Sequence, residues 1–97
     1  MSQSHTESES FYSRFRNQLI LSQNWPGTYL FKFVVKSESP HLDKLKLLFD
    51  SYHPQFTVKQ SSKKTFTSLS IRVRMDSADQ VIKIYKQASH LEGVMAL

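Results

Sequence analysis

The fold is decided by the stretch Ser61–Leu97, which reads SSKKTFTSLSIRVRMDSADQVIKIYKQASHLEGVMAL. It opens with a polar hairpin tip, and the residues that follow, TFTSLSIRVRM, alternate between polar and apolar side chains with the period of a half-buried strand. Ser77 and Gln80 have the spacing of a capping box, which predicts a helix at this point. Gly93 marks a turn before a last apolar strand. The chain therefore ends with a strand, a helix and a strand.

Two further stretches before the hairpin tip are predicted strands. The first covers Tyr29–Lys36, and its bulkier side is expected to face the core with Phe31, Phe33 and Val35. The second covers Gln55–Gln60, with Phe56 and Val58 expected to point inward. With the last two strands, these give a sheet of four.

A helix is predicted between the first two strands. Ser39 and Pro40 combine a capping hydroxyl with a proline in the first helical position, and Pro54 closes the segment. Apolar residues at helical spacing in this helix and in the one after Ser77 are expected to face one core: Leu42, Leu45, Leu48, Phe49, Tyr52, Val81, Ile82, Tyr85 and Ala88.

The N-terminal quarter of the chain divides into two parts. Residues 1–10 are polar and rich in serine, which predicts a disordered tail. Residues 11–24 form the next predicted segment, a short amphipathic helix in which Phe11, Phe15 and Leu19 recur at four-residue spacing. A Trp-Pro-Gly tripeptide then marks the entry to the main domain, residues 25–97.

The resulting order is β-α-β-β-α-β, preceded by an extra helix. This order predicts an α+β protein with a ferredoxin-like sandwich, in which a four-stranded antiparallel sheet carries two helices on one face. The second face of such a sheet is left open, and the side chains on it are informative about function.

The composition excludes several chemistries. The 97 residues contain no cysteine, so no thiolate nucleophile, disulfide or cysteine-ligated zinc site is expected. The four histidines lack metal-ligand spacing and are interpreted as surface residues: His5, His41, His53 and His90. With two glycines and no nucleophile elbow around any serine, we expect no phosphate loop, catalytic residue, metal or cofactor, and hence no enzyme. No signal peptide or membrane span is expected, which predicts a cytoplasmic protein.

Basic residues gather on the predicted open face of the sheet. The chain has 13 basic and 8 acidic residues and a formal net charge of +5, which favours anionic partners. Strand alternation places five of the basic residues on the open face without an acidic one: Lys32, Lys36, Lys59, Arg72 and Arg74. The candidate ligand-binding residues are Lys32, Lys59, Arg72 and Arg74. In the alternative interpretation, their aliphatic stems merely cover the sheet, or the face packs on the N-terminal helix or a second subunit.

Several short segments resemble the YbeD-like family of small bacterial proteins of unknown function. The segments that carry the resemblance are Trp25-Pro26, Tyr29-Leu30-Phe31-Lys32-Phe33, Ser61-Ser62-Lys63, Ser68, Gln80, Ile84-Tyr85, Val94 and Leu97. The resemblance implies a ferredoxin-like fold similar to ACT regulatory domains and a regulatory or ligand-binding role without established enzymatic activity. One position departs from the family, which usually carries glycine after Ser-Ser-Lys, where this chain has Lys64.

Two functions stay open at this point. The first is a regulatory module that binds an unknown protein or a small anionic ligand and forms a homodimer through exposed sheet edges. The second is an accessory protein that binds nucleic acid on the basic face. Sequence-specific RNA binding is disfavoured because Phe66 is the only aromatic residue expected on that face. The salt dependence of nucleic-acid binding distinguishes the two.

Overall fold

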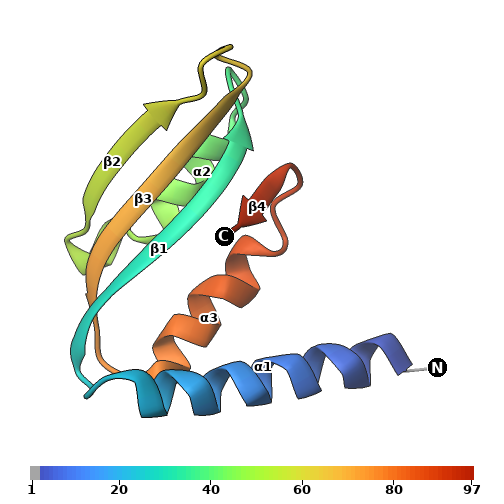
Figure 1. The fold of residues 1–97 in the computed structure, drawn as a ribbon, viewed down its shortest axis with the longest axis vertical. Helices are drawn as coiled ribbons and strands as arrows, with labels where there is room; N and C mark the ends of the chain where they lie inside the picture. The colour runs from blue at the N-terminus through green and yellow to red at the C-terminus, as the bar shows by residue number, and fades with distance from the viewer. Residues whose placement is uncertain (1–2) are drawn as a thin grey trace.

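The computed structural model describes residues 3–97, with side chains described from Glu9 onward (Figure 1). The elements in chain order are α1 (Gln3–Ser22), β1 (Gly27–Lys36), α2 (His41–Leu48), the short 3-10 helix η1 (Asp50–Tyr52), β2 (Gln55–Gln60), β3 (Phe66–Met75), α3 (Ala78–Ala88) and β4 (Val94–Ala96). The four strands form one antiparallel sheet in the order β2-β3-β1-β4. This arrangement confirms the predicted ferredoxin-like α+β fold.

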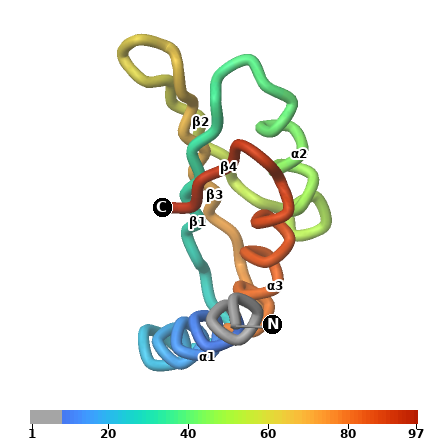
Figure 2. Tube along the Cα trace, turned by 90° about the vertical axis from the view of Figure 1, so that its right-hand side faces the viewer, coloured from blue at the N-terminus to red at the C-terminus, as the bar shows by residue number. Residues whose placement is uncertain are grey.

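The molecule has two layers, since α2 and α3 cover one face of the sheet and leave the other bare (Figure 2). The central strands β1 and β3 pair over ten residues, from Gly27 opposite Met75 to Lys36 opposite Phe66. Fully buried side chains fill the space between sheet and helices: Phe31, Phe33, Val35, Leu45, Phe49, Leu69, Ile71, Met75, Val81 and Ile84. The predicted inward residues of β1 and β3 are therefore buried, and Ile84 joins them. Four of the residues predicted to face the core are only partly buried against it: Leu42, Leu48, Tyr52 and Tyr85.

The two predicted helix starts differ in outcome. At α3 the Ser77 hydroxyl oxygen accepts a hydrogen bond from the Gln80 N–H at 3.2 Å, and the Gln80 side-chain oxygen accepts one from the Asp76 N–H at 2.7 Å. The predicted cap by Ser77 is confirmed, and the reciprocal bond of Gln80 goes to Asp76, one residue before the position that a standard capping box uses. At α2 the predicted cap is wrong, because the Ser39 hydroxyl donates to the carbonyl oxygen of Lys36 at 2.7 Å and so closes the turn after β1.

Strand β2 has the predicted orientation but not the predicted burial. Phe56 and Val58 pair with Ile71 and Leu69, so they lie on the helix-covered side of the sheet. Their exposed fractions are nevertheless 38% and 46%. The reason is that β2 is the edge strand, with a neighbouring strand on one side alone; from α2, the Lys46 Nζ lies 5.6 Å from the centre of the Phe56 ring.

Helix α1 is longer than the sequence predicted. It begins at Gln3, so the prediction of a disordered tail over residues 1–10 is wrong where the structure describes that segment; residues 1 and 2 lie outside the described residues. Once a helix is nucleated, each added residue contributes a hydrogen bond, so polar residues can extend an amphipathic segment backward. An Arg14 to Ser10 hydrogen bond of 2.9 Å, one turn apart, supports the extension.

Three contacts fix α1 across one end of the sheet (Figure 1). Leu19 is 4% exposed and belongs to the core, and the Trp25 indole N–H donates to its carbonyl oxygen at 3.0 Å. Arg16 makes a two-pronged ion pair with Asp79 at the start of α3. Within residues 3–97 no helix combines the length and the apolar character needed to cross a membrane.

Candidate functional site: a basic open sheet face

The open face of the sheet displays all the basic residues that the strands contain. Residues directly opposite each other in an antiparallel pair share a face. Arg72 therefore lies with Leu30, Arg74 with Thr28, and Lys32 with Ser70. The same register adds Lys36, opposite Phe66, and Lys59, opposite Ser68. No strand contains an acidic residue, so this basic face carries one sign of charge.

The four candidate residues are not equally close to one another. Arg72 and Arg74 are neighbours on the same face of β3, and Lys32 is the diagonal neighbour of Arg72, a relation that places Cα atoms about 7–8 Å apart. Lys59 lies on the edge strand β2, with β3 between it and Lys32. Lys32 and Arg72 therefore form the central cluster of the basic face, with Arg74 beside Arg72 toward the Gly27–Met75 end of the strand pair and Lys59 at the margin.

These basic side chains are exposed and make no ion pair within the described residues. On the helical side, by contrast, Arg16 is matched to Asp79. The hydrogen bonds that Arg16 donates to the Asp79 carboxylate raise the pKa of Arg16 and lower the pKa of Asp79. The basic face therefore differs from the helical side in having no acidic residue among its charges, whereas α2 and α3 carry Asp43 and Asp79.

Apolar side chains alternate with the basic ones on this face. Leu30 is 42% exposed at the centre, and Met95, opposite Val34, is 59% exposed on β4. Phe66 is 47% exposed near the hairpin tip, where it lies opposite Lys36. The basic face thus combines positive charge with apolar area, and its one aromatic ring lies away from the central cluster.

The hairpin tip has a defined backbone conformation. The Ser61 N–H donates to the carbonyl oxygen of Phe66 at 2.8 Å, and the Lys64 N–H donates to the carbonyl oxygen of Ser61 at 2.9 Å. Lys64 has a φ of 57°, the left-handed region that favours glycine. Lys64 therefore has the backbone conformation that glycine favours, although it stands where the family usually has glycine.

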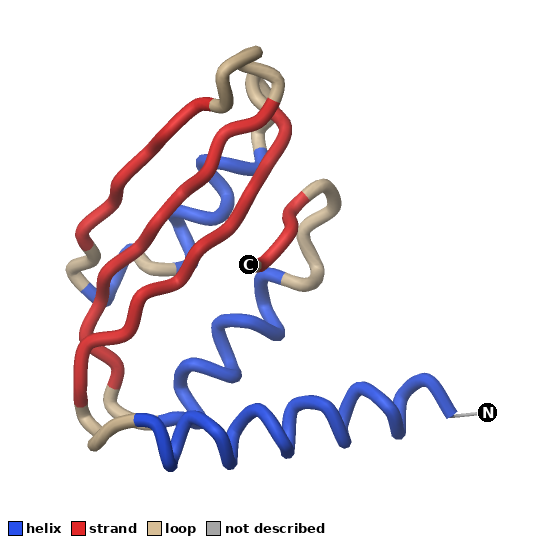
Figure 3. The backbone as a smooth tube through the Cα atoms, viewed as in Figure 1, coloured by secondary structure: helices blue, strands red, loops and turns tan. Residues whose placement is uncertain are grey.

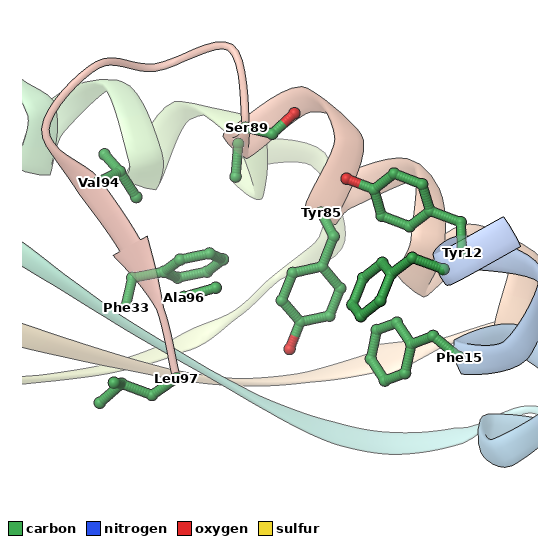
Figure 4. Close-up of a pocket in the computed structure, with 10 residues that line it drawn as sticks. Tyr12, Phe15, Phe33, Tyr85, Ser89, Val94, Ala96 and Leu97 are labelled. Atoms are coloured by element: carbon green, nitrogen blue, oxygen red, sulfur yellow. The ribbon is translucent and has the colours of Figure 1, made fainter. Parts of the chain in front are cut away.

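A cavity of about 330 Å³ lies on the other side of the sheet, between α1, α3 and β4 (Figure 4). Its lining is apolar and includes Tyr12 and Phe15 from α1, Tyr85 from α3, Phe33 from β1 and Ala96 from β4. The sequence analysis missed this cavity, although the regular spacing of the α1 aromatics was the available signal. That spacing by itself predicts an apolar helix face and not the hollow beside it.

The Tyr85 ring forms one wall of the cavity, and its hydroxyl lies 3.2 Å from that of Tyr29. Burial, together with this hydrogen bond, raises the pKa of Tyr85. The phenol is therefore neutral at physiological pH and serves to fix the ring. Its ring centre is 5.3 Å from that of Phe15, so α1 and α3 meet through these aromatics.

Of the four histidines interpreted as surface residues, His41 departs from that interpretation. It is half-buried, and its Nδ1 is buried without a hydrogen-bond partner among the described residues. Its ring lies against Gly93, where an added Cβ would be 3.0 Å from the imidazole. His53 and His90 are exposed, and the side chain of His5 lies outside the described residues. Among the described side chains, no three His, Asp or Glu residues gather in a way that suits a metal ion.

Comparison with known proteins gives a sequence family and relatives. Residues 22–97 match the family described as "Protein of unknown function (DUF493)". The chain is 33% identical over 73 residues to a "UPF0250 protein" of Shewanella piezotolerans and 32% identical over 73 residues to one of Shewanella halifaxensis. Each match covers 72% of this chain and 83% of the relative. These matches confirm the resemblance to the YbeD-like family.

Two solved structures share the fold. Protein HP0495 from H. pylori superposes with a TM-score of 0.63 at 16% identity, over 78% of this chain and 86% of that one. The ACT domain from GTP pyrophosphokinase of Chlorobium tepidum superposes with a TM-score of 0.50 at 10% identity, over 73% of this chain and 100% of that domain. The fold is therefore ACT-like, and helix α1 lies almost entirely outside the region matched to the sequence family.

Proposed function

We propose that this chain, which belongs to the DUF493 family of proteins of unknown function, is a regulatory binding module that holds an acidic protein partner on its basic face. The observation that carries the proposal is the segregation of charge: the basic face has five basic side chains and no acidic residue on any strand, and none of the five forms an ion pair with another described residue. Clustered like charges repel unless solvent screens them or an anion neutralises them. An acidic partner relieves that repulsion.

The apolar residues among the charges favour a protein surface as the partner. Leu30 and Met95 offer apolar area beside Lys32 and Arg72, and interfaces between proteins combine an apolar centre with charged surroundings. A single-stranded nucleic acid requires stacking rings along its path. Phe66 is the one aromatic residue on the basic face, and it lies at the end of β3. Small ligands prefer concave sites, whereas the cavity described above lies on the opposite side of the sheet.

The experiment compares two charge-reversal variants of equal net charge. Arg72→Glu with Arg74→Glu changes the basic face, and Lys44→Glu with Lys83→Glu changes exposed helix positions by the same amount. Binding of a fluorescent poly-glutamate peptide of about 20 residues is measured by anisotropy at low and high salt. We expect the first variant to bind about tenfold more weakly than the unchanged protein and the second to bind within about twofold. Circular dichroism checks that both variants are folded.

Two results would contradict the proposal. Equal weakening in the two variants would mean that the peptide senses only net charge. Tighter binding of a single-stranded RNA of about 20 nucleotides, lost in the Arg72→Glu, Arg74→Glu variant and falling steeply with salt, would make the basic face a nucleic-acid surface instead.

A further inference from the structure

One edge of strand β1 has no paired strand along half of its length. It spans ten residues, whereas β4 pairs with only three of them, Phe33 to Val35. One further bond, from the Leu97 N–H to the carbonyl oxygen of Lys32 at 2.8 Å, ends the pairing. Figure 3 shows how short β4 is beside the long central strands. The edge of β1 from Phe31 back to Gly27 therefore lacks a strand partner within the described residues.

The hydrogen-bond pattern identifies which backbone groups face this edge. The Ser37 N–H donates to the carbonyl oxygen of Thr65 at 2.9 Å, so the backbone N–H and C=O groups of the odd-numbered residues of β1 point toward β3. The backbone groups of the even-numbered residues point toward the β4 side, as the carbonyl of Lys32 does. The Thr28 carbonyl oxygen is already bonded to the Gln23 amide at 3.1 Å. The N–H and C=O of Leu30 thus point to the open edge, with no partner among the described residues.

The cavity lies where a continuation of β4 would run. Phe33 and Ala96, which pair with each other, form its sheet side, and Tyr85 and Phe15 form the opposite wall (Figure 4). In an added strand, a residue opposite Phe31 would project to the helix-covered side and so into the cavity. The next residue, opposite Leu30, would project to the basic face as a diagonal neighbour of Lys32.

We propose that an extended peptide segment of a partner protein, with alternating apolar and acidic residues, adds as a strand to β1 beside Leu30. Its backbone pairs with the free N–H and C=O of Leu30, an apolar side chain enters the 330 Å³ cavity, and an acidic side chain lies near Lys32. Strand addition of this kind draws affinity from the backbone and specificity from pockets for alternate side chains. The preference for acidic residues rests on the proposed function, whereas the backbone and cavity contacts do not.

Synthetic peptides of eight residues test the proposal on the full chain. One alternates Leu and Glu, a second has the same composition in two blocks, and a third alternates Leu and Ser. Hydrogen exchange followed by NMR should show the Leu30 amide exchanging at least about tenfold more slowly with the first peptide, because pairing protects an amide that is otherwise open. The block peptide should give no protection, and the Leu-Ser peptide should bind more weakly than the Leu-Glu peptide.

Two tryptophan variants separate the cavity from the rest of the surface. Ala96→Trp fills the cavity and should weaken binding of the Leu-Glu peptide about tenfold. Leu47→Trp places the same side chain at an exposed position of α2, outside the cavity lining and the basic face, and should leave affinity within about twofold. A Leu-Glu peptide with one central proline, tested on the unchanged protein, should lose binding because proline cannot donate to the strand.

Each contrary result identifies what is wrong. Protection of Gln55–Gln60 in place of Leu30 would put the peptide on strand β2 and overturn the proposal. Full binding to Ala96→Trp, with loss in Arg72→Glu, would place the peptide on the basic face; the inference would then be wrong while the proposed function stands. Equal binding of the Leu-Ser peptide would overturn the acidic preference and count against the proposed function.

Discussion

Replacing Lys64 by glycine should stabilise the protein. Lys64 lies at the hairpin tip with a φ of 57°, a conformation that brings Cβ too close to the following carbonyl oxygen. Its backbone N–H donates to the Ser61 carbonyl oxygen at 2.9 Å, and glycine retains that bond. The substitution therefore removes steric strain without removing a backbone contact.

The magnitude follows from two opposing terms. A left-handed lysine costs about 1–2 kcal/mol relative to its preferred conformations. Glycine makes the unfolded chain more flexible, which offsets about 0.4–1 kcal/mol of that gain. The net gain in the free energy of unfolding is about 0.5–1 kcal/mol, and for a domain of this size it raises Tm by about 2–8 °C.

The assay is urea unfolding followed by circular dichroism, with Lys63→Gly as the matched control. Lys63 carries the same charge at the same tip but is not among the residues with positive φ. Its replacement brings the entropic cost of glycine without relief of strain, so the midpoint should fall. If Lys64→Gly is no more stable than Lys63→Gly, the left-handed conformation of this position is not what determines the stability of the tip.

Three further predictions concern the core, pH and self-association. Phe33→Ala should lower the free energy of unfolding by about 3–5 kcal/mol in the same assay, since the ring is fully buried; a loss under about 1 kcal/mol would contradict the assigned core. Folding raises the pKa of Tyr85 above its unfolded value of 10.0, so the unfolded chain ionises first as pH rises. The stabilisation that this difference provides is complete below pH 10.0 and declines above it, so the free energy of unfolding should fall above about pH 10. Tyr85→Phe should remove the part of that fall that comes from ionisation of Tyr85. We also propose a homodimer through the exposed edge strand β2, which light scattering at about tens of micromolar should detect and Val58→Lys should abolish; a monomer in the unchanged protein would refute it.

The order of elements and the faces of the long strands follow from local patterns, so they could be predicted from the sequence. The side-chain period of a strand is two, and alternation alone placed Ile71 in the core and Arg72 on the basic face. The cap at Ser77 likewise depends on residues three apart, whose separation the chain itself fixes. The candidate residues on the basic face were predictable for the same reason.

What the sequence left undetermined depends on contacts between distant segments. The direction of Phe56 was predictable from alternation, but its exposure is a property of the sheet edge and of how far α2 extends over it. The cavity likewise exists because α1 crosses the end of the sheet and brings Phe15 to Tyr85, which is 70 residues away in the chain.

The sequence by itself determined which residues share a face, because the backbone of a single strand or helix imposes that period on its own side chains. The tertiary structure alone decided how much of each face and edge is covered. The open edge of β1 beside Leu30 is the clearest case, since it exists because β4 ends its pairing near Lys32 while β1 continues to Gly27. No local pattern in β1 encodes that difference, because the length of a pairing is set by both strands and by the helices packed behind them.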